Sequence, residues 1–187
     1  MAPSRIFMFK TPVLALAMMA VAAGCAQPAA EQRYGLGRTP TAAEVAAWDI
    51  DVRADGAGLP SASGTVRQGR LIYEEKCAAC HGARGEGGPG PRLAGGFGTL
   101  STANPVLSVG SFWPYASTLY DYINRAMPFD KPQSLTPSQV YAVTAYTLRL
   151  NNIVGDDAML DKFSLPAVEM PNRHGFSAPD PRPDTYH

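Results

Sequence analysis

The feature that most constrains this chain is a run of five residues, Cys77-Ala78-Ala79-Cys80-His81. Two thiols two residues apart, followed at once by an imidazole, form the pattern of covalent haem attachment. Both thiols can then reach the two vinyl groups on one edge of the porphyrin, while the next residue turns its imidazole toward the iron. One helical turn that ends in histidine meets these needs. The motif therefore predicts one covalent haem c, bound through Cys77 and Cys80, with His81 as an iron ligand.

Two other uses of a cysteine pair fit the sequence less well. A structural zinc site takes four ligands, usually from two such pairs. The third cysteine of this chain is Cys25, and the other histidines, His174 and His187, lie near the C-terminus. A thioredoxin-type redox pair needs a βαβ context, and the sequence predicts no strand. Haem attachment is the interpretation that the spacing favours.

The second axial ligand decides what such a haem can do. Met127 lies far downstream of the motif and directly precedes Pro128, at the end of a predicted helix. A thioether on the iron raises the reduction potential and fills the coordination shell, which suits electron transfer rather than oxygen chemistry. Methionine is more commonly a filler of the core. The other candidates are Met159, Met170 and His174. We expect Met127 to be the ligand.

Further residues are candidates for the wall of a haem pocket. A ligating histidine has its other ring nitrogen held by a carbonyl, carboxylate or water. In the segment GPRL at 90–93, the Pro91 carbonyl could do this, with Leu93 against the haem ring; the alternative is an ordinary Gly/Pro turn. Aromatic side chains could also wall the pocket and reach a propionate, or be plain core. These are Trp113, Tyr115 and Tyr122.

Three helices are predicted around these residues, which makes the fold class all-α. Apolar periodicity indicates helices over about 65–77 and 115–126, the second with Leu119 and Ile123 on its apolar face and Pro114 in its first turn. The clearest start is Thr136-Pro137-Ser138-Gln139, an N-cap, a proline and a glutamine in capping-box spacing. Asn151 ends this third helix, whose apolar face includes Val143 and Thr147. A capping box at 41–44 predicts one further short helix.

The first 24 residues are typical of an export signal. Arg5 and Lys10 precede an apolar stretch at 13–23 that is short for a membrane span. The signal ends in VAAGC, which resembles the lipobox of bacterial lipoproteins and predicts lipidation of Cys25. The alternative is ordinary cleavage after Ala22, which leaves Cys25 as a free thiol. Both place the mature protein outside the cytoplasm, in the periplasm.

Composition sets the remaining limits. Basic and acidic residues number 16 each, without the clustered positive charge of a nucleic-acid footprint. Gly numbers 18 and Pro 17, so loops are extensive. The predicted divisions are a signal peptide at 1–24, an N-terminal extension at 25–64, a haem domain at 65–152 and an extended C-terminal tail at 153–187. The two extensions gain their order either from another protein or by wrapping the haem domain.

The central region resembles the class I cytochrome c family. The residues that carry this resemblance are Gly69, Tyr73, the haem motif, residues 90–93, Met127-Pro128, Tyr141 and Tyr146. In that family the first and last helices cross near the glycine, and the haem sits in the shell that they make with the middle helix. The resemblance implies a class I cytochrome c fold with His81 and Met127 as axial ligands.

A narrower resemblance covers nearly the whole mature chain. The segments YGLGR at 34–38, WDIDV at 48–52, DGAGLP at 55–60, VGSFWPY at 109–115 and MPNR at 170–173 are similar to cytochrome subunits of periplasmic sulfur-oxidising molybdenum enzymes. These are the sulfite dehydrogenases and the related sulfane dehydrogenase of thiosulfate oxidation.

This resemblance implies a role in electron transfer, with no catalysis by this chain alone. Electrons would pass one at a time from a molybdenum sulfite dehydrogenase subunit to a downstream cytochrome or oxidase. The single haem motif favours a sulfite dehydrogenase, since members of the sulfane dehydrogenase type can carry a second haem domain. The alternatives are a free-standing electron shuttle and a haem enzyme or gas sensor with an open sixth position.

Overall fold

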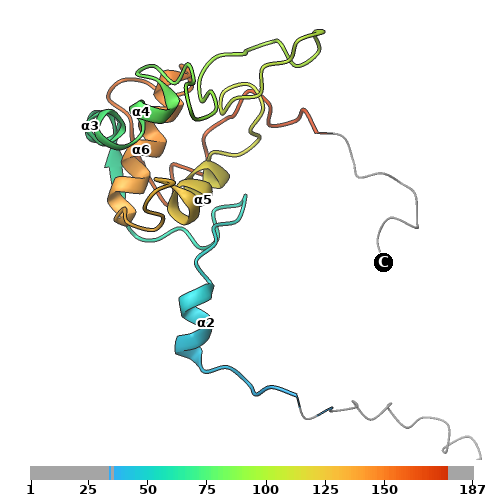
Figure 1. Ribbon diagram of the computed structural model, residues 1–187, viewed down its shortest axis with the longest axis vertical. Coiled ribbons are helices and arrows are strands. Elements are labelled where there is room, and N and C mark those ends of the chain that lie inside the picture. Colours follow the sequence, from blue (N-terminus) through green and yellow to red (C-terminus); the bar gives the residue numbers. More distant parts are fainter. Residues whose placement is uncertain (1–33, 35, 177–187) are drawn as a thin grey trace, which may run out of the picture. The chain divides into compact units, whose positions relative to one another are not determined.

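The fold is mainly helical, as predicted (Figure 1). The structure is a computed structural model that describes residue 34 and residues 36–176. The elements in chain order are α2 (Ala42–Trp48), β1 (Ser63–Thr65), α3 (Val66–Lys76), α4 (Ala78–His81), α5 (Ala116–Ala126), α6 (Pro137–Leu150) and β2 (Met159–Asp161). The predicted signal peptide, Cys25 and His187 lie outside the described residues. Within the described part of the chain, no helix combines the length and apolar character needed to cross a membrane.

Helix α3 begins where the sequence places its capping box. The Thr65 side chain accepts a hydrogen bond from the Gln68 N–H, and the Gln68 side chain accepts one from the Thr65 N–H. One turn later, Gly69 allows α3 to press directly against α6. A Cβ at Gly69 would lie 1.9 Å from the Ala142 carbonyl oxygen. Glycine is therefore required for this close crossing of α3 and α6 (Figure 1).

Helix α6 is the centre of the core. Its predicted capping box is present, with Pro137 in the first turn and Asn151 as C-cap. Most of its sides are covered, and several of its side chains have no measurable exposure. These fully buried residues of α6 are Val140, Tyr141, Thr144, Ala145 and Leu148. A helix buried nearly all round needs neighbours on several sides, which α3, α5 and the β1–β2 pair provide.

Helix α5 starts one residue later than expected. Tyr115 is its N-cap, in an extended conformation, so Pro114 precedes the helix and the prediction of Pro114 in the first turn is wrong. The Tyr115 ring lies instead under the Arg173 guanidinium, 4.5 Å from the ring centre. That long-range contact with the C-terminal tail could not be read from local sequence. Leu119 and Ile123 of α5 are buried, as the periodicity predicts.

The prediction of no strand is wrong. β1 and β2 form a short antiparallel pair in which Gly64 is opposite Leu160. A strand of three residues is too short to display an alternating pattern, so periodicity could not reveal it. The pairing joins the end of the N-terminal extension to the C-terminal tail.

Parts of both extensions wrap the domain. In the tail, Leu160, Leu165 and Met170 are buried in the main core. In the N-terminal extension, Val52 is buried, and the Pro60 carbonyl accepts a hydrogen bond of 3.0 Å from the Tyr141 hydroxyl. For residues 52–62 and 153–170, wrapping the domain is thus the interpretation that the structure supports.

Candidate functional site

One cavity of about 730 Å³ collects most of the predicted site residues. Cys77, Cys80 and His81 reach it from the α3–α4 junction, and Met127 reaches it from the C-terminal end of α5. These residues are far apart in the sequence, and the fold brings their side chains to one space. A cavity of this size falls in the usual range for cofactor sites.

The haem motif forms the single helical turn that the chemistry requires. Cys77 is both the C-cap of α3 and the N-cap of α4. The Cys77 carbonyl accepts hydrogen bonds from the Cys80 N–H at 3.1 Å and from the His81 N–H at 2.9 Å. Gly82 then turns the chain away at φ +82°, a conformation that favours glycine. The turn fixes both thiols and the imidazole on one short segment.

A backbone carbonyl orients His81, as expected. The His81 Nδ1 lies 2.7 Å from the Pro91 oxygen, and because a carbonyl only accepts, Nδ1–H is the donor. The Nε2 atom is then left unprotonated and able to bind a metal. Gly90 packs so closely that a Cβ there would lie 3.0 Å from the His81 ring. The hydrogen bond that the sequence predicts between His81 and the Pro91 carbonyl is present.

Two free thiols are available at the cavity. Neither cysteine forms a disulfide within the described part of the chain. Burial, with a smaller effect of Cys80, raises the pKa of Cys77 to about 11. The Cys77 thiol therefore stays protonated at neutral pH, and its surroundings suit an uncharged sulfur. A thioether bond would leave such a sulfur uncharged.

The wall of the cavity is apolar. Leu93 lines it, as predicted. Trp113 and Tyr122 also line it, with their ring centres 5.9 Å apart in an edge-to-face arrangement. Tyr115 does not line it, because its ring lies against Arg173. Sequence reasoning did not assign further wall residues to the site, although their helical periodicity had marked several as apolar faces. These are Leu119, Ile123, Val143 and Thr147, together with Val109 and Leu135.

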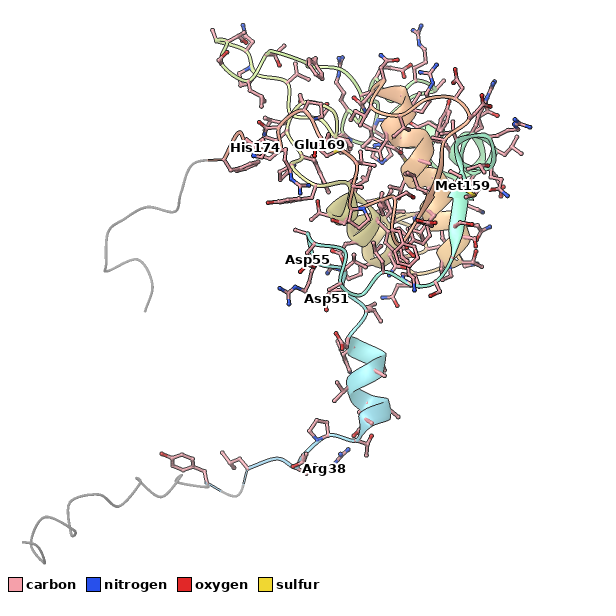
Figure 2. The ribbon with its side chains drawn as sticks, turned by 180° about the vertical axis from the view of Figure 1, so that it is seen from behind. Arg38, Asp51, Asp55, Met159, Glu169 and His174 are labelled. Atoms are coloured by element: carbon pink, nitrogen blue, oxygen red, sulfur yellow. The ribbon has the colours of Figure 1, made fainter. Side chains whose placement is uncertain are left out.

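The rival iron ligands lie elsewhere. Met159 is 55% exposed on β2, and Met170, from the tail, is buried in the main core. His174 is exposed in the last described turns. None of these three lines the cavity, and Figure 2 shows Met159 and His174 on different parts of the surface. The geometry therefore supports the prediction of Met127 as the second axial ligand.

The residues present fit a haem. The cavity offers two thiols, an imidazole with a free nitrogen, a thioether and an apolar wall, which is the donor set of a c-type haem with histidine and methionine on the iron. Among residues 34 and 36–176, no cluster of three or more His, Cys, Asp or Glu side chains could hold a metal ion. The zinc alternative thus lacks its ligands in that part of the chain.

Comparison with known proteins defines the class of protein. The sequence model of the Cytochrome c family matches residues 66–151. The chain belongs to the cytochrome c family and has the class I cytochrome c fold. Family membership implies that the haem is covalent haem c. A search of curated proteins finds no match.

The particular likeness is to a chain in the crystal structure of the sulfane dehydrogenase SoxCD from Paracoccus pantotrophus. The two chains share 44% sequence identity, with a TM-score of 0.75. The match covers 82% of this chain and 76% of the other. This match confirms that the chain resembles a protein from a sulfur-oxidising enzyme.

Proposed function

We propose that this chain is the electron-accepting cytochrome subunit of a periplasmic molybdenum sulfur dehydrogenase. The observation that carries the proposal is the joining of Cys77, Cys80, His81 and Met127 around one apolar cavity, in a chain 44% identical to one from SoxCD. A haem in this cavity supplies one-electron oxidation and reduction. Catalysis on the sulfur compound belongs to the partner subunit.

The axial residues favour electron transfer over ligand chemistry. His81 Nε2 would bind the iron, since Nδ1 donates its hydrogen bond to the Pro91 carbonyl. Met127 lines the same cavity, and its sulfur is the second ligand in this proposal. With both positions taken, a substrate or gas has no open site, so the haem enzyme and sensor alternatives are disfavoured. Leu93, Leu119 and Val143 line the cavity with apolar side chains, and such surroundings would raise the reduction potential of a haem held there.

Electrons enter and leave where the cavity meets solvent. Phe129 and Leu107 both line the cavity, and they are 85% and 58% exposed. Charged residues of both signs surround them on the cavity lining: Lys76, Arg92 and Lys131, with Glu75 and Asp130. This rim is the proposed contact for the molybdenum subunit and, in turn, for a downstream cytochrome or oxidase.

Two sulfur substrates are candidates. The single Cys-x-x-Cys-His motif favours a single-haem subunit of a sulfite dehydrogenase. The 44% identity to a chain of SoxCD favours a sulfane dehydrogenase as the second candidate. The purified complex decides between them, because sulfite reduces its haem in the first case and a sulfane-sulfur substrate does so in the second.

The test of the proposed function is co-purification. We expect the haem-loaded chain to form a stable complex with a molybdenum subunit and to be reduced when the sulfur substrate is added. A clean monomer that no molybdenum protein reduces would leave the free-standing shuttle as the function. Acidified organic solvent should not extract the haem, because thioether bonds hold it.

The ligand assignment has a spectroscopic test. Met127→Ala should abolish the weak near-infrared Met-to-iron band of the oxidised protein and lower the reduction potential. Met159→Ala is the control, since Met159 is 55% exposed and lies outside the cavity. Persistence of the band in Met127→Ala, or its absence from the wild type, would overturn the assignment.

Export and lipidation complete the proposal. We place the mature chain in the periplasm, held at a membrane by acylated Cys25. Mass spectrometry of the mature N-terminus measures this directly. A diacylglycerol-modified Cys25 supports the anchor, whereas an N-terminus at residue 23 with a free Cys25 thiol would remove it.

A further inference from the structure

The N-terminal arm, defined here as residues 42–50, exposes large apolar side chains. Trp48 is 87% exposed and Val45 is 46% exposed. Helix α2 lies within this arm and buries none of its residues. A helix of seven residues is too short to be stable in water without packing. Its apolar face therefore calls for a surface outside the described part of the chain.

The base of the arm is fastened to the haem domain. The Val52 N–H donates a hydrogen bond of 2.7 Å to Asp121 Oδ1, and Val52 is only 6% exposed. The Asn124 side chain reaches the Ile50 carbonyl at 3.5 Å. Asp121 and Asn124 belong to α5, the helix that lines the cavity with Leu119 and Ile123. A protein that binds the arm is thus connected to α5, the helix that lines the haem site.

The charge of the arm selects the kind of surface that it fits. Residues 42–51 carry three acidic residues, Glu44, Asp49 and Asp51, and the nearest basic residues are Arg38 and Arg53. Asp51 lies in the loop that follows α2 (Figure 2). An exposed tryptophan flanked by carboxylates complements an apolar pocket edged by lysine or arginine.

The likeness to SoxCD extends beyond the haem domain. The cytochrome c family matches residues 66–151, less than half of the chain, whereas the SoxCD chain matches over 82% of it. The likeness to that chain therefore extends past the residues that the family model matches. This supports the enzyme subunit as the surface that the arm meets, because a likeness that extends past the haem domain exceeds what haem binding needs.

We infer that Trp48 anchors the N-terminal arm in an apolar, basic-edged pocket of the molybdenum subunit. This inference rests on the proposed function. Large, rigid aromatic side chains are the commonest anchors of protein interfaces, and removing one weakens binding by about 30-fold or more. The arm thereby provides affinity, and the cavity rim remains free for electron exchange.

The test measures how tightly single variants of the haem-loaded protein bind the purified molybdenum subunit. We expect Trp48→Ala to weaken the complex by about 30-fold or more in a titration that measures Kd. Alanine is the best helix former, so α2 is not weakened by this change. The matched control is Phe163→Ala, because Phe163 is 76% exposed and lies in the tail. Asp49→Asn should slow association mainly at low salt.

Each outcome separates the inference from the proposed function. If the wild type does not bind the molybdenum subunit, the proposed function fails, and this inference fails with it. If the wild type binds and Trp48→Ala binds within threefold of it, only the inference fails. The inference is also overturned if Trp48→Ala and Phe163→Ala weaken the complex equally. It is overturned as well if Trp48→Ala changes only the self-association of this chain and leaves its binding to the molybdenum subunit unchanged. The haem spectrum and reduction potential should stay unchanged in all these variants.

Discussion

The two ends of the described chain look alike in sequence and differ in structure. Both are rich in Gly and Pro and both flank the haem domain. The tail places Leu160, Leu165 and Met170 in the core, whereas the N-terminal arm leaves Trp48 and Val45 exposed. Apolar residues in the tail thus stabilise the fold, and those in the arm remain available for another protein. Composition alone does not distinguish these two uses.

The largest expected effect tests the tail. Leu165 has no measurable exposure, so Leu165→Ala should lower the free energy of unfolding by about 2–5 kcal/mol through lost apolar burial and the cavity left behind. Denaturant unfolding of the haem-loaded protein, followed by circular dichroism, measures this. A loss below about 0.5 kcal/mol would mean that the tail does not belong to the core, and the comparison would break.

The next effect tests the attachment of the chain to α5 just after the arm, at Val52. Asp121 accepts hydrogen bonds from the Val52 N–H and from Arg125, and its side chain is only 12% exposed. Asp121→Ala leaves the Val52 N–H without its acceptor, so we expect a loss of roughly 1–3 kcal/mol. The same unfolding experiment provides the measurement.

The control for Asp121 is a carboxylate in a solvent-exposed ion pair. Asp157 lies 3.8 Å from Arg67, and both side chains are more than four-fifths exposed. Asp157→Ala should change the free energy of unfolding by less than about 0.5 kcal/mol. Equal effects of the two variants would show that Val52 is not fastened by Asp121.

How far the sequence predicts these features depends on the range of the interactions. The capping boxes at Thr65 and Thr136 and the haem-motif turn were predicted, because each is complete within a few residues. The hydrogen bond from His81 to the Pro91 carbonyl could also be predicted, because one short loop joins the two residues. The β1–β2 pair was missed, because strand pairing joins residues nearly a hundred positions apart.

The cavity wall was predicted only in part for the same reason. Periodicity marked Leu119 and Val143 as apolar faces of helices, but not which face meets the haem rather than another helix. Tyr115 was assigned to the pocket, and a contact with Arg173 from the tail holds its ring elsewhere. Such choices depend on the assembled fold, which no local pattern contains.

A smaller effect concerns acid and again involves the tail. The pKa of Asp161 is lowered, chiefly because its carboxylate accepts hydrogen bonds from the Ser164 and Phe163 N–H groups. A depressed pKa stabilises the fold above the unfolded value of about 3.9, and this stabilisation is lost as pH falls through the folded pKa. Asp161→Asn should therefore reduce stability at neutral pH and flatten its decline in acid. Unfolding measured across pH 2–6 checks this, and parallel curves for variant and wild type would contradict it.

The smallest expected effect on stability comes from the residue with the largest expected effect on binding. Trp48→Ala removes a side chain that is 87% exposed, so the free energy of unfolding should change by less than about 0.5 kcal/mol. Phe163→Ala, in the tail but also exposed, should behave alike. A loss above about 1 kcal/mol for Trp48→Ala alone would mean that the arm packs on its own domain. The arm and the tail would then both stabilise the fold, and the contrast between a tail packed in the core and an arm that binds another protein would no longer hold.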